Sequence, residues 1–233
     1  MKAILASIQP QPCQNIASLK KQWEIRKTKP KLEVPFKVYI YCTQLSTNNP
    51  ISSIAYENPK GNLYYGRKHF SSFFTSKVIG EFICDRIEEF ESEFYNDDTV
   101  MNAIYRIIRD EDNPEEYEIA ETASNEDDSE KFWICRESCL SFNEIKEYIG
   151  YDKPEKTFYG WHISQLKMYD KPKEINAFFK VCKQDLRRSA FDKDFCLSCP
   201  KQKGDTCTNT LTRPPQSWCY VEELPEKETY SAF

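Results

Sequence analysis

The segment PFKVYIYCT (35–43) restricts the possible folds of this sequence more than any other stretch. It is rich in β-branched and aromatic residues, which pack well on a pleated surface, and it therefore predicts a strand. Further segments with strand character lie at 4–8, 22–27, 77–91, 158–170 and 217–224. Because loops and inserted helices separate these strands, we expect an α+β fold built around a small mixed β-barrel rather than a parallel sheet.

The region 10–28 contains the one helix expected early in the chain and the strand that follows it. A Pro-initiated helix is predicted at 10–21, with Ile16 and Leu19 facing inward. In the strand that follows, apolar residues such as Trp23 alternate with charged residues such as Glu24 up to residue 27. This alternation predicts a strand with one face exposed to water. At 77–91, Gly80 permits a β-bulge within the predicted strand.

Charge is distributed unevenly along the 233 residues, although the net formal charge is only −5. Residues 1–80 carry 12 Lys and Arg against 3 Asp and Glu, residues 81–150 carry 6 against 22, and residues 151–233 carry 14 against 12. The first third therefore favours a polyanionic partner, which the whole-chain average conceals.

These shifts in composition predict that the chain is organised in three parts. Residues 1–91 form the first part of the barrel with a loop insertion at 44–76, and 92–150 form an acidic, partly helical insertion. Residues 151–233 form the rest of the barrel with a Cys-rich segment at 182–219. Within the insertion we expect a helix near 99–109, a mobile stretch, and a helix at 141–150 that has a Ser N-cap, a Glu at the fourth position and a Gly stop.

The order and wording of six segments resemble the ASCH domain, a family of PUA-like small β-barrels. The segments are MKAILASIQP, IASLKKQWEIRKT, PFKVYIYCT, KVIGEFICD, YGWHISQLKMYDKPKEI and RPPQSWCYVEEL, and together they touch nearly the whole chain. The sequence is especially similar to the long ASCH proteins carried by phages and prophages of Gram-positive bacteria. The resemblance implies a PUA-like barrel interrupted by the insertions at 44–76 and 92–150.

The family pattern at the turn between helix and strand is Gly-x-Lys-Thr-x-Glu-x-Arg. Here Leu19 stands in place of the Gly and Gln22 in place of the Thr, whereas Lys21, Glu24 and Arg26 are kept. Losing the Gly implies that the turn is rebuilt or the helix extended. The family binds RNA or nucleotide-like ligands in a cleft beside this turn.

The resemblance therefore implies a ligand-binding site formed by Lys21, Trp23, Glu24 and Arg26. Lys is a compact cation that neutralises a phosphate, and Arg presents a planar fork. Glu24 would orient both cations or accept from a base amine, and Trp23 would support the wall of the cleft. The surrounding lysines at 20, 27, 29 and 31 fit a solvated surface equally well.

Two other functions remain open. Some small ASCH members resemble amidohydrolases that act on acylated cytidine, and in such an enzyme Lys21 and Glu24 would be catalytic. In those members a hydroxyl stands where this chain has Glu24, which speaks against the reaction. The acidic 81–150 region is either a solvated face or a mimic of nucleic acid, through which a phage protein would inhibit a host defence nuclease.

The cysteines favour a structural metal site. Cys182, Cys196, Cys199 and Cys207 follow the spacing C-x13-C-x2-C-x7-C, and Cys219 is a further candidate. Four thiolates close a tetrahedral zinc site, and a 4Fe–4S cluster accepts the same number of thiolates. We expect zinc, with the cluster and a set of free thiols as alternatives.

No apolar run approaches the length of a membrane span, and MKAILASI is too short for a signal peptide. The sequence thus predicts a cytoplasmic protein without a membrane partner. The leading interpretation is a non-enzymatic ASCH/PUA-like protein whose partner is RNA or a nucleotide. A host protein is the alternative partner.

Overall fold

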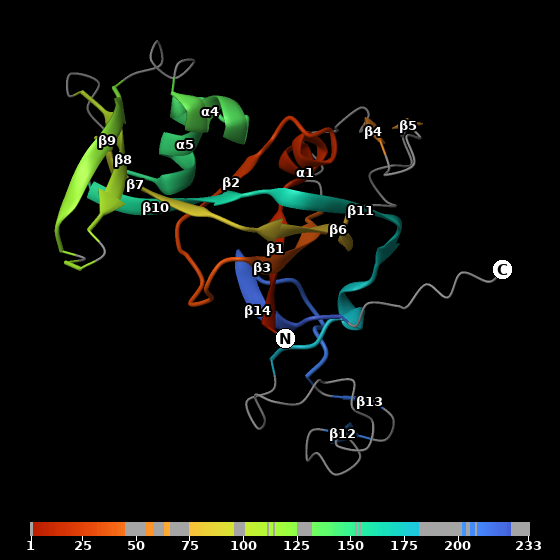
Figure 1. Ribbon diagram of the computed structural model, residues 1–233. Coiled ribbons are helices and arrows are strands. Elements are labelled where there is room, and N and C mark those ends of the chain that lie inside the picture. The colour runs from red at the N-terminus through yellow and green to blue at the C-terminus, as the bar shows by residue number, and fades with distance from the viewer. Residues whose placement is uncertain are drawn as a thin grey trace.

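The structure is a computed structural model that describes most of the chain (Figure 1). The described residues are 2–44, 75–95, 101–110, 112–113, 115–124, 132–151, 153, 155–181 and 209–224, together with the backbone of 55–57, 63–65, 202–203 and 206–207.

Within these residues the chain forms mainly strands. The helices are α1 (Pro10–Ala17), α4 (Trp133–Ser138), α5 (Phe142–Ile149) and the short 3-10 helix η1 (Ile175–Ala177). The strands are β1 (Lys2–Ile8), β2 (Trp23–Arg26), β3 (Phe36–Cys42), β4 (Ala55–Glu57), β5 (Leu63–Tyr65), β6 (Lys77–Cys84), β7 (Ile87–Glu93), β8 (Ala103–Arg109), β9 (Tyr117–Ala123), β10 (Glu155–His162), β11 (Ser164–Lys173), β12 (Gln202–Lys203), β13 (Thr206–Cys207) and β14 (Trp218–Glu222).

Two five-stranded sheets carry the architecture. The first sheet has the order β11-β6-β3-β1-β14, and its β1–β3 pair is parallel while its other pairs are antiparallel. The second sheet has the order β2-β10-β7-β8-β9 and is antiparallel throughout. The α+β class is therefore confirmed, with one mixed and one antiparallel sheet rather than a parallel one.

The chain passes between the sheets at two bends. Strand β6 in the first sheet continues through residues 85–86 into β7 in the second, and β10 returns through Ile163 into β11. The segments 77–91 and 158–170, each predicted as one strand, are thus each divided between the two sheets. Gly80 lies at an irregularity of the β3–β6 ladder, where Ile40 pairs with Gly80 and Tyr41 with Val78, so the predicted bulge is confirmed.

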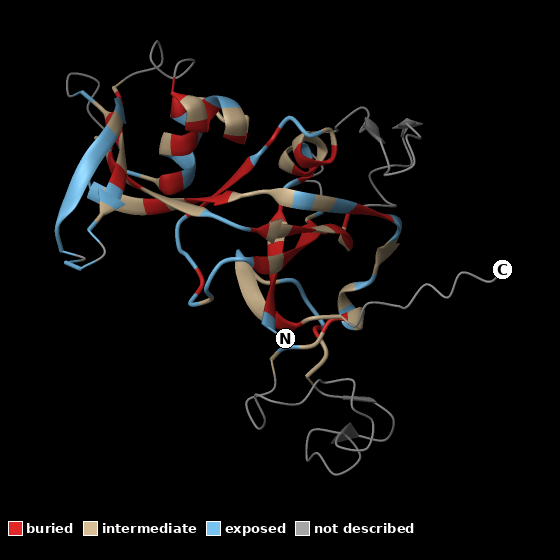
Figure 2. Ribbon diagram, viewed as in Figure 1, coloured by how far each residue is buried: buried red, intermediate tan, exposed pale blue. Residues whose placement is uncertain are grey.

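Apolar side chains fill three clusters around these sheets. Helix α1 packs Cys13 and Ile16 against one face of the first sheet. Helices α4 and α5 cover one face of the second sheet and bury Phe90 and Phe158 (Figures 1 and 2). A third cluster includes Tyr39, from β3, with residues that follow β11.

Several sequence predictions about local structure are wrong. Helix α1 ends at Ala17 instead of continuing to 21, and Leu19 is 71% exposed rather than inward-facing. The segment predicted as a helix near 99–109 contains strand β8, and strand β9 lies in the stretch that follows, where the sequence predicted no strand. β8 pairs with β7 and β9 pairs with β8, and this pairing stabilises the extended conformation in a way that local propensity cannot reveal.

The predicted helix at 141–150 is confirmed as α5. Ser141 accepts a hydrogen bond from the Glu144 backbone, and the Glu144 side chain accepts one from the Ser141 backbone, so the capping box is complete. Most of the predicted loop at 44–76 lies outside the described residues, but its described backbone pairs β4 with β5. In the described part of the chain, no helix combines the length and apolarity needed to cross a bilayer.

Candidate functional site

The turn that joins α1 to β2 is held in place by backbone hydrogen bonds. Leu19 adopts a left-handed conformation with φ of 59°, and the N–H groups of Lys20 and Lys21 both donate to the Asn15 carbonyl, at 2.9 and 3.0 Å. The Gln22 backbone then donates to the Glu137 carbonyl at 2.7 Å. The turn thus keeps a conformation suited to glycine although the glycine is absent.

Strand β2 buries all four of its residues, so the prediction that one face lies in water is wrong. Trp23 packs in the cluster beneath α4 and α5, whereas Glu24 and Arg26 share the opposite face. Both of these charged residues are nearly inaccessible because the second sheet meets the first sheet there. A buried charge must find a partner, and these two find each other.

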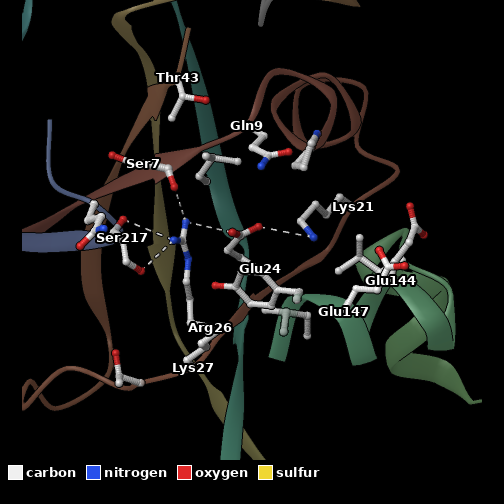
Figure 3. A pocket seen from close by; sticks show the side chains of 17 residues that line it. Ser7, Gln9, Lys21, Glu24, Arg26, Lys27, Thr43, Glu144, Glu147 and Ser217 are labelled. Carbon is white, nitrogen blue, oxygen red and sulfur yellow. Dashed lines mark hydrogen bonds and ion pairs between the residues drawn. The ribbon is translucent and has the colours of Figure 1, made fainter. Parts of the chain in front are cut away.

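Lys21, Glu24 and Arg26 form a buried ion-pair triad (Figure 3). Glu24 is central, with Oε1 2.9 Å from Arg26 Nη2 and Oε2 3.4 Å from Lys21 Nζ. The exposed fractions of the three side chains are 2% for Lys21, 9% for Glu24 and 4% for Arg26. The structure therefore brings together the three residues that the family pattern singled out.

The two cations of the triad also satisfy backbone carbonyls on other elements. Lys21 Nζ donates to the Ser138 carbonyl at the end of α4, 2.7 Å away, where a cation is favourable. Arg26 donates to the Ser7 carbonyl at 3.0 Å and to the Ser217 carbonyl at 3.3 Å. Arg26 thereby connects β2, at the edge of the second sheet, with the β1–β14 edge of the first.

A pocket of about 810 Å³ opens above this triad (Figure 3). Its walls come from the end of β1, the start of α1, strand β2, helix α5 and the segment before β14. The lining residues are Ser7, Ile8, Gln9, Pro12, Lys21, Glu24, Ile25, Arg26, Lys27, Thr28, Thr43, Leu140, Glu144, Glu147, Tyr148, Gln216 and Ser217. The lining holds three cations and three carboxylates, so the pocket itself is balanced in charge.

One buried donor of the triad remains unused. Among the described residues, no group meets hydrogen-bond geometry at Arg26 Nε, although that atom is buried. The Tyr148 phenol lies near the same guanidinium. Burial raises the pKa of Tyr148, and the positive charge of Arg26 acts in the opposite direction. An unsatisfied buried donor costs stability, and a ligand acceptor would remove that cost.

Tyr148 and Lys27 form the outer part of the pocket. The Tyr148 residue is 39% exposed, and Lys27 Nζ lies 5.3 Å from the centre of its ring. Sequence analysis predicted the helix that carries Tyr148 but did not assign the residue to the site. Tyr148 lies more than a hundred positions from β2 in the sequence, so no local sequence pattern indicates that the two are neighbours.

Trp23, which was predicted to support the wall of the cleft, is not among the residues that line the pocket. Its ring is tilted by 50° against the His162 ring, with 4.8 Å between the ring centroids, and its Nε1 donates to Glu137 at 3.0 Å. The alternation of a strand places it on the face opposite Glu24. His162 in turn contacts Asp85 through Nδ1 at 2.6 Å, a structural partner that the sequence did not reveal.

The outer lysines at 20, 27, 29 and 31 are exposed. Lys29 Nζ lies 3.2 Å from Glu89 Oε2 and 5.1 Å from the Tyr159 ring centre, so it belongs to the surface of the second sheet. Of these lysines only Lys27 lines the pocket.

The predicted metal site falls largely outside the described residues. Cys182, Cys196 and Cys199 are not described, and for Cys207 only the backbone is described. Cys219 packs beside the third apolar cluster, where burial raises the pKa of its thiol. No group of three potential ligands occurs in the part that is described. Zinc therefore stays a prediction, which the metal content of the purified protein would test.

No protein-family model matches the sequence, and no curated protein matches it significantly. Among solved structures, the chain is similar to the crystal structure of ASCH from Zymomonas mobilis, with 14% identity, a TM-score of 0.38, and coverage of 74% of this chain and 73% of that chain. A tyrosine-to-phenylalanine mutant of that protein gives 14% identity and a TM-score of 0.39 over 75% and 77% of the two chains. A serine-to-alanine mutant gives 15% and 0.38 over 78% and 84%. The chain is thus similar to structures of an ASCH protein, the family whose motifs its sequence resembles.

Proposed function

We propose that this chain is a non-enzymatic, ASCH-type protein that binds RNA or a nucleotide by holding one unpaired nucleotide in the pocket beside turn 19–28. The observation that carries the proposal is the buried triad at the base of the pocket, in which Arg26 Nε has no partner among the described residues. A base edge offers hydrogen-bond acceptors and donors side by side. Arg26 Nε would donate to the base, and Glu24 retains acceptor capacity for a base amine.

The charge balance of the pocket distinguishes between parts of the nucleotide. Glu24 pairs with both Lys21 and Arg26, and Glu144 and Glu147 add two further carboxylates to the lining, so neither buried cation is free for a phosphate. Lys27 is the exposed cation at the rim. The inner pocket therefore suits a neutral base, with the Tyr148 ring as a stacking surface and Lys27 positioned for a phosphate.

The triad geometry favours binding over hydrolysis. A lysine nucleophile must be a free amine, whereas the Ser138 carbonyl and Glu24 around Lys21 are partners that suit an ammonium. Glu24 is likewise engaged by two cations and stands in place of the hydroxyl that the amidohydrolase reading requires. We therefore keep Lys21 and Glu24 as ligand-positioning residues.

Tyr148→Leu tests the proposal, because it removes the aromatic ring while leaving the three charged residues of the triad in place. We would measure binding of single-stranded RNA, structured RNA, duplex RNA and the four nucleoside monophosphates by fluorescence anisotropy and calorimetry. Loss of stacking should weaken binding of the unpaired ligands about tenfold or more. The matched control is Tyr151→Leu, because Tyr151 is similarly exposed at 46% and does not line the pocket.

Salt provides the second arm of this test. A pocket that holds a base and one phosphate should give a shallow dependence of affinity on salt, with a slope near that of one phosphate contact. Equal binding by the two tyrosine variants would refute the pocket as the site. A steep salt slope with no preference for unpaired RNA would instead indicate backbone binding on the basic outer surface.

A further inference from the structure

Strand β9 forms an open edge of the second sheet (Figure 1), and none of its residues lines the pocket. Within the described residues it pairs only with β8, and six of its seven residues are exposed or half-buried (Figure 2). An edge strand that nothing covers presents unpaired backbone N–H and C=O groups, which a further strand can pair with. β9 therefore has the backbone chemistry of a strand-docking site.

The two faces of β9 differ in chemistry. The register pairs Ile107 with Ile119 and Arg109 with Tyr117, so Ile119 and Tyr117 share one face. The register also pairs Ile108 with Glu118 and Arg106 with Glu121. Arg106 and Ile108 are two residues apart on β8 and therefore share a face, and the ladder shifts between these two pairs. Both glutamates thus lie on the face opposite Tyr117 and Ile119. β9 thus has one apolar face and one acidic face.

The side chains on both faces remain accessible. Ile119 is 56% exposed and Tyr117 is 45% exposed, which is unusual for large apolar residues on a regular strand. On the acidic face, Glu121 lies 3.6 Å from Arg106 and its side chain is still 40% exposed. Arg109 lies 5.6 Å from the centre of the Tyr117 ring, so the described part of the chain covers these side chains in part and leaves the rest of their surface accessible.

The sequence around β9 strengthens the acidic character. Residues 110–130 contain eleven Asp and Glu and no Lys or Arg. A second copy of this strand would bring further carboxylates and no cation, so self-pairing is electrostatically unfavourable. A cationic strand would instead find opposite charges directly across the ladder.

We propose that the free edge of β9 binds an extended protein segment in which cationic and apolar residues alternate. Such a segment adds a sixth strand to the second sheet. Its apolar residues lie beside Tyr117 and Ile119, and its Lys or Arg residues lie beside Glu118 and Glu121. Backbone hydrogen bonds supply the pairing, and the period of two along a strand supplies the specificity. This interaction is independent of the nucleotide pocket.

The test uses a labelled peptide of about six residues with alternating lysine and valine. Its binding to the whole protein is measured by fluorescence anisotropy, beside an alternating glutamate–valine peptide and a lysine–valine peptide with a central proline. We expect the lysine–valine peptide alone to bind. The glutamates would repel the second peptide, and proline would remove a ladder donor from the third.

A charge-reversed protein makes the test specific. The double variant Glu118→Lys/Glu121→Lys should weaken binding of the lysine–valine peptide about tenfold and gain binding of the glutamate–valine peptide. The matched control, Glu115→Lys/Glu116→Lys, makes the same change of charge on exposed residues that precede β9. It should retain most of the wild-type affinity.

Four results would overturn the proposal. These are an absence of peptide binding, equal binding of the proline peptide, an equal loss of affinity in the control variant, and no gain of the glutamate–valine peptide in a reversed variant that circular dichroism shows to be folded. The second and third would reduce the interaction to general charge attraction without strand pairing.

Discussion

Leu19 holds a left-handed backbone conformation that a side chain with a Cβ adopts at a cost of roughly 1–2 kcal/mol. Its side chain is 71% exposed, so little apolar burial repays that cost. Leu19→Gly should therefore raise the free energy of unfolding by about 1 kcal/mol, after the greater freedom of glycine in the unfolded chain is deducted. Urea unfolding would measure the change.

Leu19→Ala is the control for this prediction, because alanine keeps the Cβ and should give no comparable gain. A loss of stability in Leu19→Gly would show that the leucine side chain stabilises the turn. The sequence has Leu19 where the resembled pattern has Gly, but it could not show that the turn adopts a left-handed conformation.

Glu24 is the one carboxylate between two buried cations. Glu24→Gln keeps the shape but leaves Lys21 and Arg26 buried and uncompensated, so it should lower the free energy of unfolding by about 3–5 kcal/mol. Glu147→Gln is the matched control, because Glu147 lines the same pocket from the exposed surface of α5 and its change should stay within about 0.5 kcal/mol. Equal stability of both variants would contradict the central role of Glu24.

At the scale of single residues, sequence analysis singled out the three members of the triad together with Trp23, which does not line the pocket. Lys21, Glu24 and Arg26 meet because a turn and a strand of period two place them together, and the family pattern records that local geometry. Trp23 lies on the other face of the same strand. Tyr148 and Ser217 reach the pocket only through the tertiary fold, which the local sequence does not encode.

Among the elements, β6 shows how one glycine sets the geometry of two ladders. A Cβ at Gly80 would lie 2.7 Å from the Lys167 carbonyl oxygen, a backbone atom of β11 that cannot move alone. Gly80→Ala should destabilise the protein by about 1–3 kcal/mol, measured by urea unfolding.

Gly160→Ala provides the comparison for Gly80. A Cβ there would meet side-chain atoms of Trp23, Ile134 and Phe90 at 3.1–3.3 Å, and those side chains can shift. The loss of stability should be smaller than for Gly80→Ala. The opposite order would mean that the β6–β11 ladder adapts more readily than the apolar cluster beneath α4.

The hairpin of β7 and β8 explains why the helix prediction near 99–109 failed. Ile104, Ile107 and Ile108 have the spacing of a helical face, yet β-branched residues also favour strands. Cross-strand ion pairs decide in favour of the strand. Arg106 Nη2 lies 3.0 Å from Glu88, and Arg109 contacts Glu89. The sequence alone does not show that these arginines and glutamates face each other across two strands.

The same ion pairs predict a response to acid. Burial tends to raise the pKa of Glu89, but hydrogen bonds from Arg109 and Lys29 outweigh it and hold the pKa below its ordinary value of 4.5. A carboxyl whose pKa is lower in the folded state stabilises the protein above the unfolded pKa. That contribution disappears as the pH falls through the folded pKa. Stability should therefore decrease below about pH 4.5.

Urea unfolding between pH 7 and pH 3 would measure this response. Glu89→Gln and Arg109→Gln should each flatten the decrease below pH 4.5, and the double variant should flatten it little further. An unchanged slope in Glu89→Gln would show that other carboxyls account for the acid response.

In the whole molecule, the two sheets are joined by continuous strands at one side and by Arg26 at the other. The α+β class and most strands were predictable, because apolar and β-branched runs mark strands locally. The division of 77–91 and 158–170 between the two sheets was not predictable, because a bend of one or two residues leaves no strong sequence pattern. The resulting pocket lies where the sheet edges, α5 and the 216–217 segment converge.

The central claim is that this pocket holds an unpaired nucleotide. Hydrogen–deuterium exchange of the protein with and without single-stranded RNA tests it most directly, because exchange locates the contact along the chain. We predict slower exchange in the segments 7–9, 24–28, 144–148 and 216–217, with β9 unchanged. Unaltered exchange in those segments at saturating RNA, or protection confined to other surfaces, would contradict the account.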